Sequence, residues 1–173
     1  GLMREAGKLV ARALQLCRGL AKPGVRTAEI DKAVDDLYST NGATPLFKGY
    51  TGAGLPPFPA ATCISVNEQV VHGIPGSRVI KEGDLIKIDT ACKLNGWCAD
   101  AAITLPMGEV RADRRRVIRV AQEVLQIAID EVGKRRWWSG VAMRMERYAE
   151  KAGFRMVQSF VGHGIGREMH EPP

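Results

Sequence analysis

Two aspartates on either side of a turn signal are the strongest chemical feature of the sequence. Asp89 and Asp100 are separated by Asn95-Gly96, a dipeptide typical of a two-residue hairpin turn. In the register that this turn imposes, Asp89 lies opposite Ala102, so Asp100 lies on the same face of the sheet, one diagonal step away. Diagonal neighbours are ~7–8 Å apart, within reach of an ion shared between their side chains. A one-residue change in loop length would put the two carboxylates on opposite faces.

The chemistry that this pair predicts is the binding of a divalent cation. Two carboxylates on one sheet face, flanked by apolar residues, repel each other unless a positive group lies between them. A metal ion and a neighbouring Lys or Arg side chain both meet that need, so the spacing alone leaves both alternatives open.

All three histidines stand in segments punctuated by glycine or proline. His72 precedes Gly73, His163 lies within Gly162–Gly166, and His170 precedes Glu171-Pro172. Loops on a rigid scaffold are where binding sites are built, although each histidine could be purely structural and Gly162–Gly166 could be a backbone anion nest. Imidazole together with carboxylates suits Co, Mn, Fe or Zn better than Mg or Ca.

The elements that must position these residues follow from hydrophobic periodicity and turn signals. Apolar residues at helical spacing predict helices over 2–20, 27–38, 113–132 and 139–152, and strand-like runs predict strands over 62–66, 69–72, 84–92, 97–105 and 154–160. Thr27 and Asp113 are the expected N-caps of two of these helices. The order of helices, hairpins, helices and a strand indicates an α+β fold rather than a regular βαβ alternation.

Composition indicates one ordinary globular domain. The chain has 173 residues, 45% of them hydrophobic, and no apolar run approaches the roughly 18 residues that a membrane span needs. Because no leader or lipidation motif appears, we expect a cytoplasmic protein without a membrane partner. The four cysteines form no CxxC pair, which favours reduced, packed thiols over disulfides.

Two basic runs flank the third predicted helix and contribute to a net charge of +6. Arg114–Arg116 and Lys134–Arg136 can be a solvated helix surface or a contact with ribosomal RNA. The adjacent Trp137-Trp138 can be partly buried at a helix start or can form a partner-binding patch.

Taken together, the motifs resemble those of the type I methionine aminopeptidases, metallopeptidases of the M24 family with the pita-bread fold. The resemblance runs from about Met3 to the last residue, and its ordered set of motifs is highly specific. The stretches that carry it are Cys63-Ile64-Ser65-Val66-Asn67-Glu68, Val70-Val71-His72-Gly73-Ile74-Pro75, Glu82-Gly83-Asp84 with Ile88-Asp89, Asp100, Gly162-His163-Gly164-Ile165-Gly166 and His170-Glu171-Pro172-Pro173.

The resemblance implies a role for each matching residue. Asp89 resembles the carboxylate that grips one of two divalent metals, Asp100 the one that bridges both, and His163 the sole histidine ligand. His72 resembles the histidine that contacts the substrate beside the scissile bond. His170 resembles the one that hydrogen-bonds the substrate carbonyl and its tetrahedral intermediate. The family's pocket for the methionine side chain falls at Phe47, Tyr50, Phe58, Cys63 and Met169, although Thr51–Pro57 looks longer than in the shortest bacterial members.

What the resemblance implies for the whole chain is a metal-dependent enzyme that removes the N-terminal methionine from nascent polypeptides. Its cofactors would be two divalent metal ions (Co, Mn, Fe, Zn or Ni), and we expect a monomer. The fold would be a truncated pita-bread fold, a curved antiparallel sheet covered by helices, in one catalytic-type domain spanning residues 1–173.

The family takes two further glutamates from strands beyond the His-Glu-x-Pro motif, and this sequence ends at Pro173. We therefore expect a C-terminally incomplete chain with three of five metal ligands and little or no activity on its own. A proline-specific pita-bread peptidase and a non-catalytic binding module of the same fold are the alternatives. Cys63–Glu68 and Val70–Pro75 favour the methionine type over the first, and the intact Asp89, Asp100 and histidines argue against the second.

Overall fold

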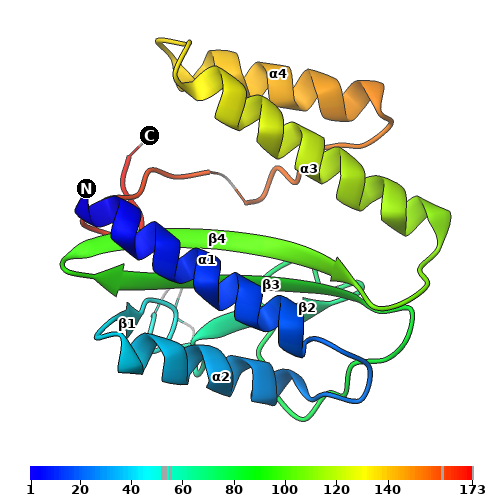
Figure 1. The fold of residues 1–173 in the computed structure, drawn as a ribbon. Coiled ribbons are helices and arrows are strands. Elements are labelled where there is room, and N and C mark those ends of the chain that lie inside the picture. The colour runs from blue at the N-terminus through cyan, green and yellow to red at the C-terminus, as the bar shows by residue number, and fades with distance from the viewer. Residues whose placement is uncertain (52–53, 55, 161, 173) are drawn as a thin grey trace. The chain divides into compact units, whose positions relative to one another are not determined.

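A computed structural model describes residues 1–51, 54, 56–160 and 162–172 of the chain (Figure 1). Its elements are α1 (Leu2–Leu20), α2 (Thr27–Thr40), β1 (Thr44–Pro45), β2 (Thr62–Val66), β3 (Leu85–Leu94), β4 (Trp97–Pro106), α3 (Ala112–Val132) and α4 (Trp138–Lys151). They form two compact units, the first made of Gly1–Val110 with Gly164–Pro172 and the second of Arg111–His163. That the whole chain acts as one catalytic domain stays a prediction.

The first unit is built on an antiparallel sheet with β3 at its centre. β4 pairs with β3 along one edge, and β2 and the short β1 pair with different parts of its other edge. Asn95 and Gly96 have φ angles of 51° and 78°, so the turn between β3 and β4 is the left-handed two-residue turn that Asn-Gly favours. Leu94 consequently pairs with Trp97 and Asp89 with Ala102, as predicted.

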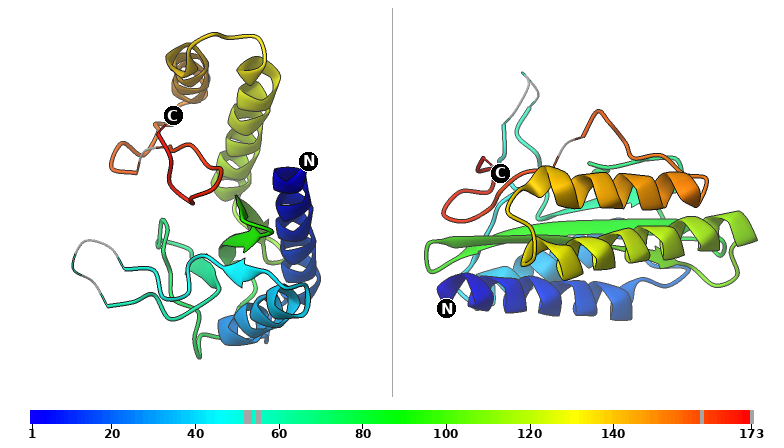
Figure 2. Two further views of the ribbon diagram at one scale, coloured as in Figure 1. Left: turned by 90° about the vertical axis from the view of Figure 1, so that its left-hand side faces the viewer. Right: turned by 90° about the horizontal axis from the view of Figure 1, so that it is seen from above.

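Alternation along β3 gives this sheet one apolar and one polar face. Ile86 and Ile88 are fully buried in the core that α1 and α2 form on one face, where the Tyr38 and Thr90 hydroxyls lie 3.0 Å apart (Figure 2). Lys87 and Asp89 point to the opposite face, because successive strand side chains alternate between the two faces of a sheet. α1 and α2 therefore do not cover the polar face of the sheet.

The second unit is a helical hairpin in which α3 and α4 lie side by side (Figure 1). Val120 and Val124 of α3 pack with Ala149 of α4. At the end of this hairpin the Arg116 guanidinium lies 5.3 Å from the centre of the Phe154 ring.

The predicted strand over 69–72 was wrong. Gln69 folds its side chain back to accept a hydrogen bond from the Val66 amide at 3.0 Å, and His72 has a φ of 57°, which no strand accommodates. The segment is instead a loop along β2.

The strand predicted over 154–160 is also absent from the described residues, because this segment begins by packing Phe154 into the helical hairpin. Both predicted N-caps were wrong by one or two residues, since the caps are Arg26 and Arg111. The Thr27 hydroxyl instead bonds to the backbone of Gly76, and Asp113 pairs with Arg111.

Several composition-based expectations can be compared directly with the structure. The four cysteines are free and buried, as expected of packed thiols. No helix among the described residues is long and apolar enough to cross a bilayer. Within Thr51–Pro57, residues 52, 53 and 55 lie outside the described part of the chain, as does Pro173.

Candidate metal and substrate site

The sheet register brings Asp89 and Asp100 together on the polar face of the first unit. Asp100 pairs with Ala91, two residues beyond Asp89 on β3, so the two carboxylates are diagonal neighbours as predicted. They share a side-chain hydrogen bond, and the Oδ1 atom of Asp100 is buried.

Burial and mutual repulsion raise the pKa of Asp89 to about 7. Loss of hydration contributes most, followed by the negative charge of Asp100 and the hydrogen bond between the two carboxyl groups, while a hydrogen bond from the Thr90 backbone lowers the pKa. The pair therefore retains a proton at a pH where an ordinary aspartate is fully ionised.

Lys87 lies on the same face of β3 as Asp89, and its ammonium bonds to the backbone. Its Nζ donates to the carbonyl oxygen of Asn67 at 2.6 Å. Because the Asp89 pKa stays high, the alternative of a neighbouring lysine that neutralises the pair has little support. Two neighbouring carboxylates that share a proton suit a divalent metal, which would displace that proton.

The structure does not assemble a complete metal site. No cluster of three or more His, Cys, Asp or Glu side chains is arranged for metal binding in the part of the chain that the structure describes. His163 belongs to the second unit, and its role as a third ligand stays a prediction.

A pocket of about 220 Å³ is lined by Asp89, Cys63 and His72, together with other residues of β2, β3, β4 and the loop that carries His72. Cys63 lies directly opposite Asp89 on β2. Burial, with the charges of Asp89 and Asp100 next in importance, raises the pKa of its thiol to about 12. Cys63 is therefore a neutral wall of the pocket, consistent with a place in an apolar substrate pocket and not with a nucleophile.

His72 reaches this pocket from a loop whose far end is locked onto β2. Gly73 donates its amide to the Ser65 hydroxyl at 2.9 Å and accepts a hydrogen bond from the Ile64 amide at 2.8 Å. A Cβ atom at position 73 would collide with the Ile64 carbonyl, so only glycine permits this approach.

His170 lies in a C-terminal segment that folds back on itself. Gly164 and Glu171 exchange two backbone hydrogen bonds of 2.7 and 2.9 Å, and a Cβ atom at Gly164 would strike the backbone of Pro172. The ring of His170 packs edge-on against that of Tyr50, with centroids 5.6 Å apart. The glycines of this motif therefore shape the loop, and two predicted substrate residues, Tyr50 and His170, are in contact.

This segment is fastened to the β3–β4 turn by residues that the sequence did not single out. The Cys98 amide donates to the Gly166 carbonyl at 2.7 Å, and the Arg167 guanidinium lies 4.4 Å from the centre of the Trp97 ring. An ion pair of 3.2 Å joins Lys93 and Glu168. Sequence patterns missed these contacts because each joins residues about 70 positions apart.

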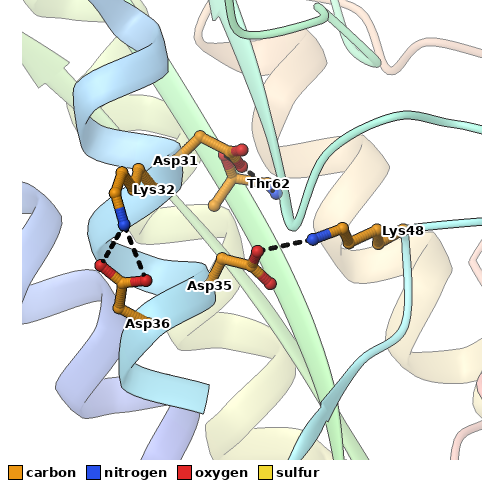
Figure 3. Close-up of polar contacts among 6 residues, drawn as sticks. All are labelled: Asp31, Lys32, Asp35, Asp36, Lys48 and Thr62. Carbon is orange, nitrogen blue, oxygen red and sulfur yellow. Dashed lines mark hydrogen bonds and ion pairs between the residues drawn. The ribbon is translucent and has the colours of Figure 1, made fainter. Parts of the chain in front are cut away.

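Acidic residues of α2 hold two further segments of the site (Figure 3). Asp31 accepts hydrogen bonds from the Thr62 amide and hydroxyl at 2.8 and 2.7 Å, just before Cys63. Asp35 pairs with Lys48 at 2.6 Å, within the segment that carries Phe47 and Tyr50. These contacts give α2 a positioning function that its sequence pattern did not reveal.

The remaining predicted pocket residues lie in the first unit. Phe58 exchanges backbone hydrogen bonds with Gly49 and Tyr50, which places it beside the segment of Phe47. Phe47 and Phe58 are partly buried, Tyr50 and His170 are exposed, and Met169 is buried. Their common role as a substrate pocket stays a prediction.

Comparison with known proteins identifies the class. The model of metallopeptidase family M24 matches residues 1–173. All 173 residues of the chain align with methionine aminopeptidase 1 of Bacillus subtilis at 40% identity, and the alignment covers 68% of that protein. The chain is also 40% identical to the methionine aminopeptidase of Clostridium perfringens and covers 67% of it. This protein belongs to metallopeptidase family M24.

Solved structures agree with this assignment. The methionine aminopeptidase of Thermotoga maritima superposes with a TM-score of 0.89 at 36% identity, covering 99% of this chain and 68% of that one. The prolidase of Pyrococcus horikoshii shares the fold with a TM-score of 0.79 at 20% identity. The fold class is therefore the predicted α+β, pita-bread type.

Proposed function

We propose that this chain contributes to the metal-dependent removal of methionine from the N-terminus of nascent polypeptides. The observation that supports it best is the Asp89–Asp100 pair beside a pocket walled by Cys63 and His72, in a chain 40% identical to methionine aminopeptidases. Because the substrate is a newly made polypeptide, we place the activity in the cytoplasm. We also propose that the protein is a monomer.

In this proposal Asp89, Asp100 and His163 hold two divalent ions of the Co, Mn, Fe, Zn or Ni type. Such ions would supply Lewis acidity, activating water and polarising the scissile carbonyl. His72 contacts the substrate beside the scissile bond, and His170 donates a hydrogen bond to the oxygen that becomes negative. A donor of this kind typically contributes ~3–4 kcal/mol to the transition state.

The apolar methionine side chain would lie against Cys63, Met169 and the aromatic residues of the first unit. Cys63 suits this role because its thiol stays neutral. The proposed aromatic lining is Phe47, Tyr50 and Phe58.

Peptide cleavage by the complete gene product tests the proposal. We expect it to bind Co²⁺ or Mn²⁺ stoichiometrically in a calorimetric titration and to release methionine from Met-Ala-Ser. An Xaa-Pro peptide serves as the matched substrate for the proline-specific alternative. Cleavage of the Xaa-Pro peptide alone would establish that alternative, and the absence of both metal binding and cleavage would favour a non-catalytic module.

The charge distribution favours a second contact, with ribosomal RNA. The second unit, Arg111–His163, contains twelve Lys and Arg against six Asp and Glu, whereas the rest of the chain contains thirteen of each. The entire net charge of +6 thus belongs to the helical hairpin. Ten of its twelve basic residues are arginines, which suit phosphate recognition.

Exposed aromatic rings accompany these arginines. Trp137 is mostly exposed, at 69%, whereas Trp138 is partly buried, at 46% exposed. The Arg136 guanidinium lies 5.3 Å from the centre of the Trp137 ring. Arginine and exposed tryptophan together can stack on unpaired bases. Arg135, by contrast, already pairs with Glu131 at 2.8 Å.

Ribosome co-sedimentation tests this contact. We expect the double variant Arg114→Glu/Arg136→Glu to reduce the bound fraction by about tenfold at moderate salt, since fewer phosphates are neutralised. The double variant Lys22→Glu/Lys81→Glu, which reverses two exposed charges of the first unit, should bind like wild type. Equal binding by all three proteins would exclude the contact.

A further inference from the structure

Asn67 begins the loop that carries His72, and it is held unusually firmly. It has a left-handed φ of 55° and exchanges backbone and side-chain hydrogen bonds with Leu85, each of 2.9 Å. Its side-chain amide also donates to Asp84 at 2.7 Å. These bonds engage the backbone amide and the whole side chain of Asn67.

The remaining polar group of Asn67, its carbonyl oxygen, accepts the hydrogen bond from the ammonium of Lys87 at 2.6 Å. The donor is charged and the contact is partly buried, which makes this kind of bond stronger than a neutral one at the surface. Lys87 thus completes the near anchor of the loop, as Gly73 completes the far one.

The middle of the loop is exposed to solvent. Val70 and Val71 are 53% and 39% exposed, and His72 is exposed as well. A segment with few buried contacts opens easily unless its ends are held. The two anchors therefore help to hold His72 over the pocket.

We propose that Lys87 is a positioning residue for His72, acting through the carbonyl of Asn67. Its significance for catalysis rests on the proposed function, whereas the anchoring itself does not. The competing role is electrostatic, in which the charge of Lys87 weakens metal binding at Asp89, its neighbour on the same face of β3.

Hydrogen exchange separates the two roles. The Lys87→Met variant keeps the apolar stem and removes the ammonium. We therefore expect the amides of Asn67 and Gln69, which donate to the carbonyls of Leu85 and Val66, to exchange about tenfold faster, the loss of a net ~1.4 kcal/mol. Lys87→Arg should restore most of the protection. Lys81→Met, at an exposed lysine of the same unit, is the control and should exchange like wild type.

Kinetics of the complete gene product provide the second readout. For Lys87→Met we expect the loss on Met-Ala-Ser to fall mainly on kcat, because His72 acts beside the scissile bond, with Co²⁺ affinity unchanged and partial rescue by Lys87→Arg. Faster exchange in the absence of any peptidase activity would sustain the anchor and overturn the proposed function. Unchanged exchange at the amides of Asn67 and Gln69, or tighter Co²⁺ binding as the sole effect, would overturn the positioning role. If Lys87→Met does not fold, Lys87→Gln gives the same comparison.

Discussion

The Asp89→Asn variant of the complete gene product is expected to lose both divalent metal binding and peptidase activity. Asparagine preserves the size of the side chain but removes one of the two charges that would hold the ion. Because a direct ligand is lost, the decrease in metal affinity should exceed the ~100-fold that loss of an outer partner of a metal ligand can cause. Calorimetric titration with Co²⁺ or Mn²⁺ and hydrolysis of Met-Ala-Ser measure the two losses.

The same substitution distinguishes a metal ligand from a structural aspartate. In the metal-free protein at pH 8, removal of one of two repelling buried carboxylates should leave the free energy of unfolding unchanged or higher. The control is Asp36→Asn on α2, an exposed partner of Lys32, which should change neither metal affinity nor activity. A destabilised Asp89→Asn protein that still binds metal with wild-type affinity would show that Asp89 only supports the sheet.

The hairpin that carries the carboxylate pair could be predicted because its determinants are local. Asn95-Gly96 selects a two-residue turn, the turn sets the register, and the two-residue period of side chains then decides the face of every position. Asp89 and Asp100 follow from that register without knowledge of any other part of the fold.

The loop carrying His72 was predicted as a strand because Val70 and Val71 favour extended structure when read alone. What overrides them is tertiary: Asn67 takes a left-handed conformation to bond with Leu85, and Gln69 folds back onto Val66. Strand propensity describes how well a side chain packs against a neighbouring strand. It does not predict this segment, because hydrogen bonds at both of its ends fix the backbone as a loop.

The supports of the site could not be predicted for a different reason. Lys87 is an ordinary strand lysine in the sequence, and its acceptor is a backbone carbonyl whose direction depends on the left-handed turn at Asn67. Arg167 contacts the ring of Trp97, a residue that is distant in the sequence. Residues that could do chemistry are recognisable by type, whereas those that orient them are recognisable only from their contacts.

The contribution of Asp89 to the stability of the metal-free protein is expected to fall as the pH rises from about 4 to about 7. An aspartate in the unfolded chain titrates near 3.8, whereas the pKa of Asp89 in the folded chain is about 7, raised first by burial and then by Asp100. Between these values the folded state holds a proton that the unfolded state has released. Each pH unit can therefore cost at most ~1.4 kcal/mol, and the loss ends once Asp89 is ionised in both states.

Urea unfolding in the presence of a chelator, between pH 4 and 8, measures this effect. Other carboxylates also titrate in this range, so the informative quantity is the difference in free energy of unfolding between wild type and Asp89→Asn. We expect wild type to become less stable relative to Asp89→Asn as the pH rises toward 7. Added Co²⁺ should remove the disadvantage of wild type and release about one proton per site between pH 6 and 7, because the ion replaces the shared proton. A difference that stays constant across the whole range would mean that Asp89 ionises in the folded protein at an ordinary pH, and the inference that the two carboxylates share a proton would fail with it.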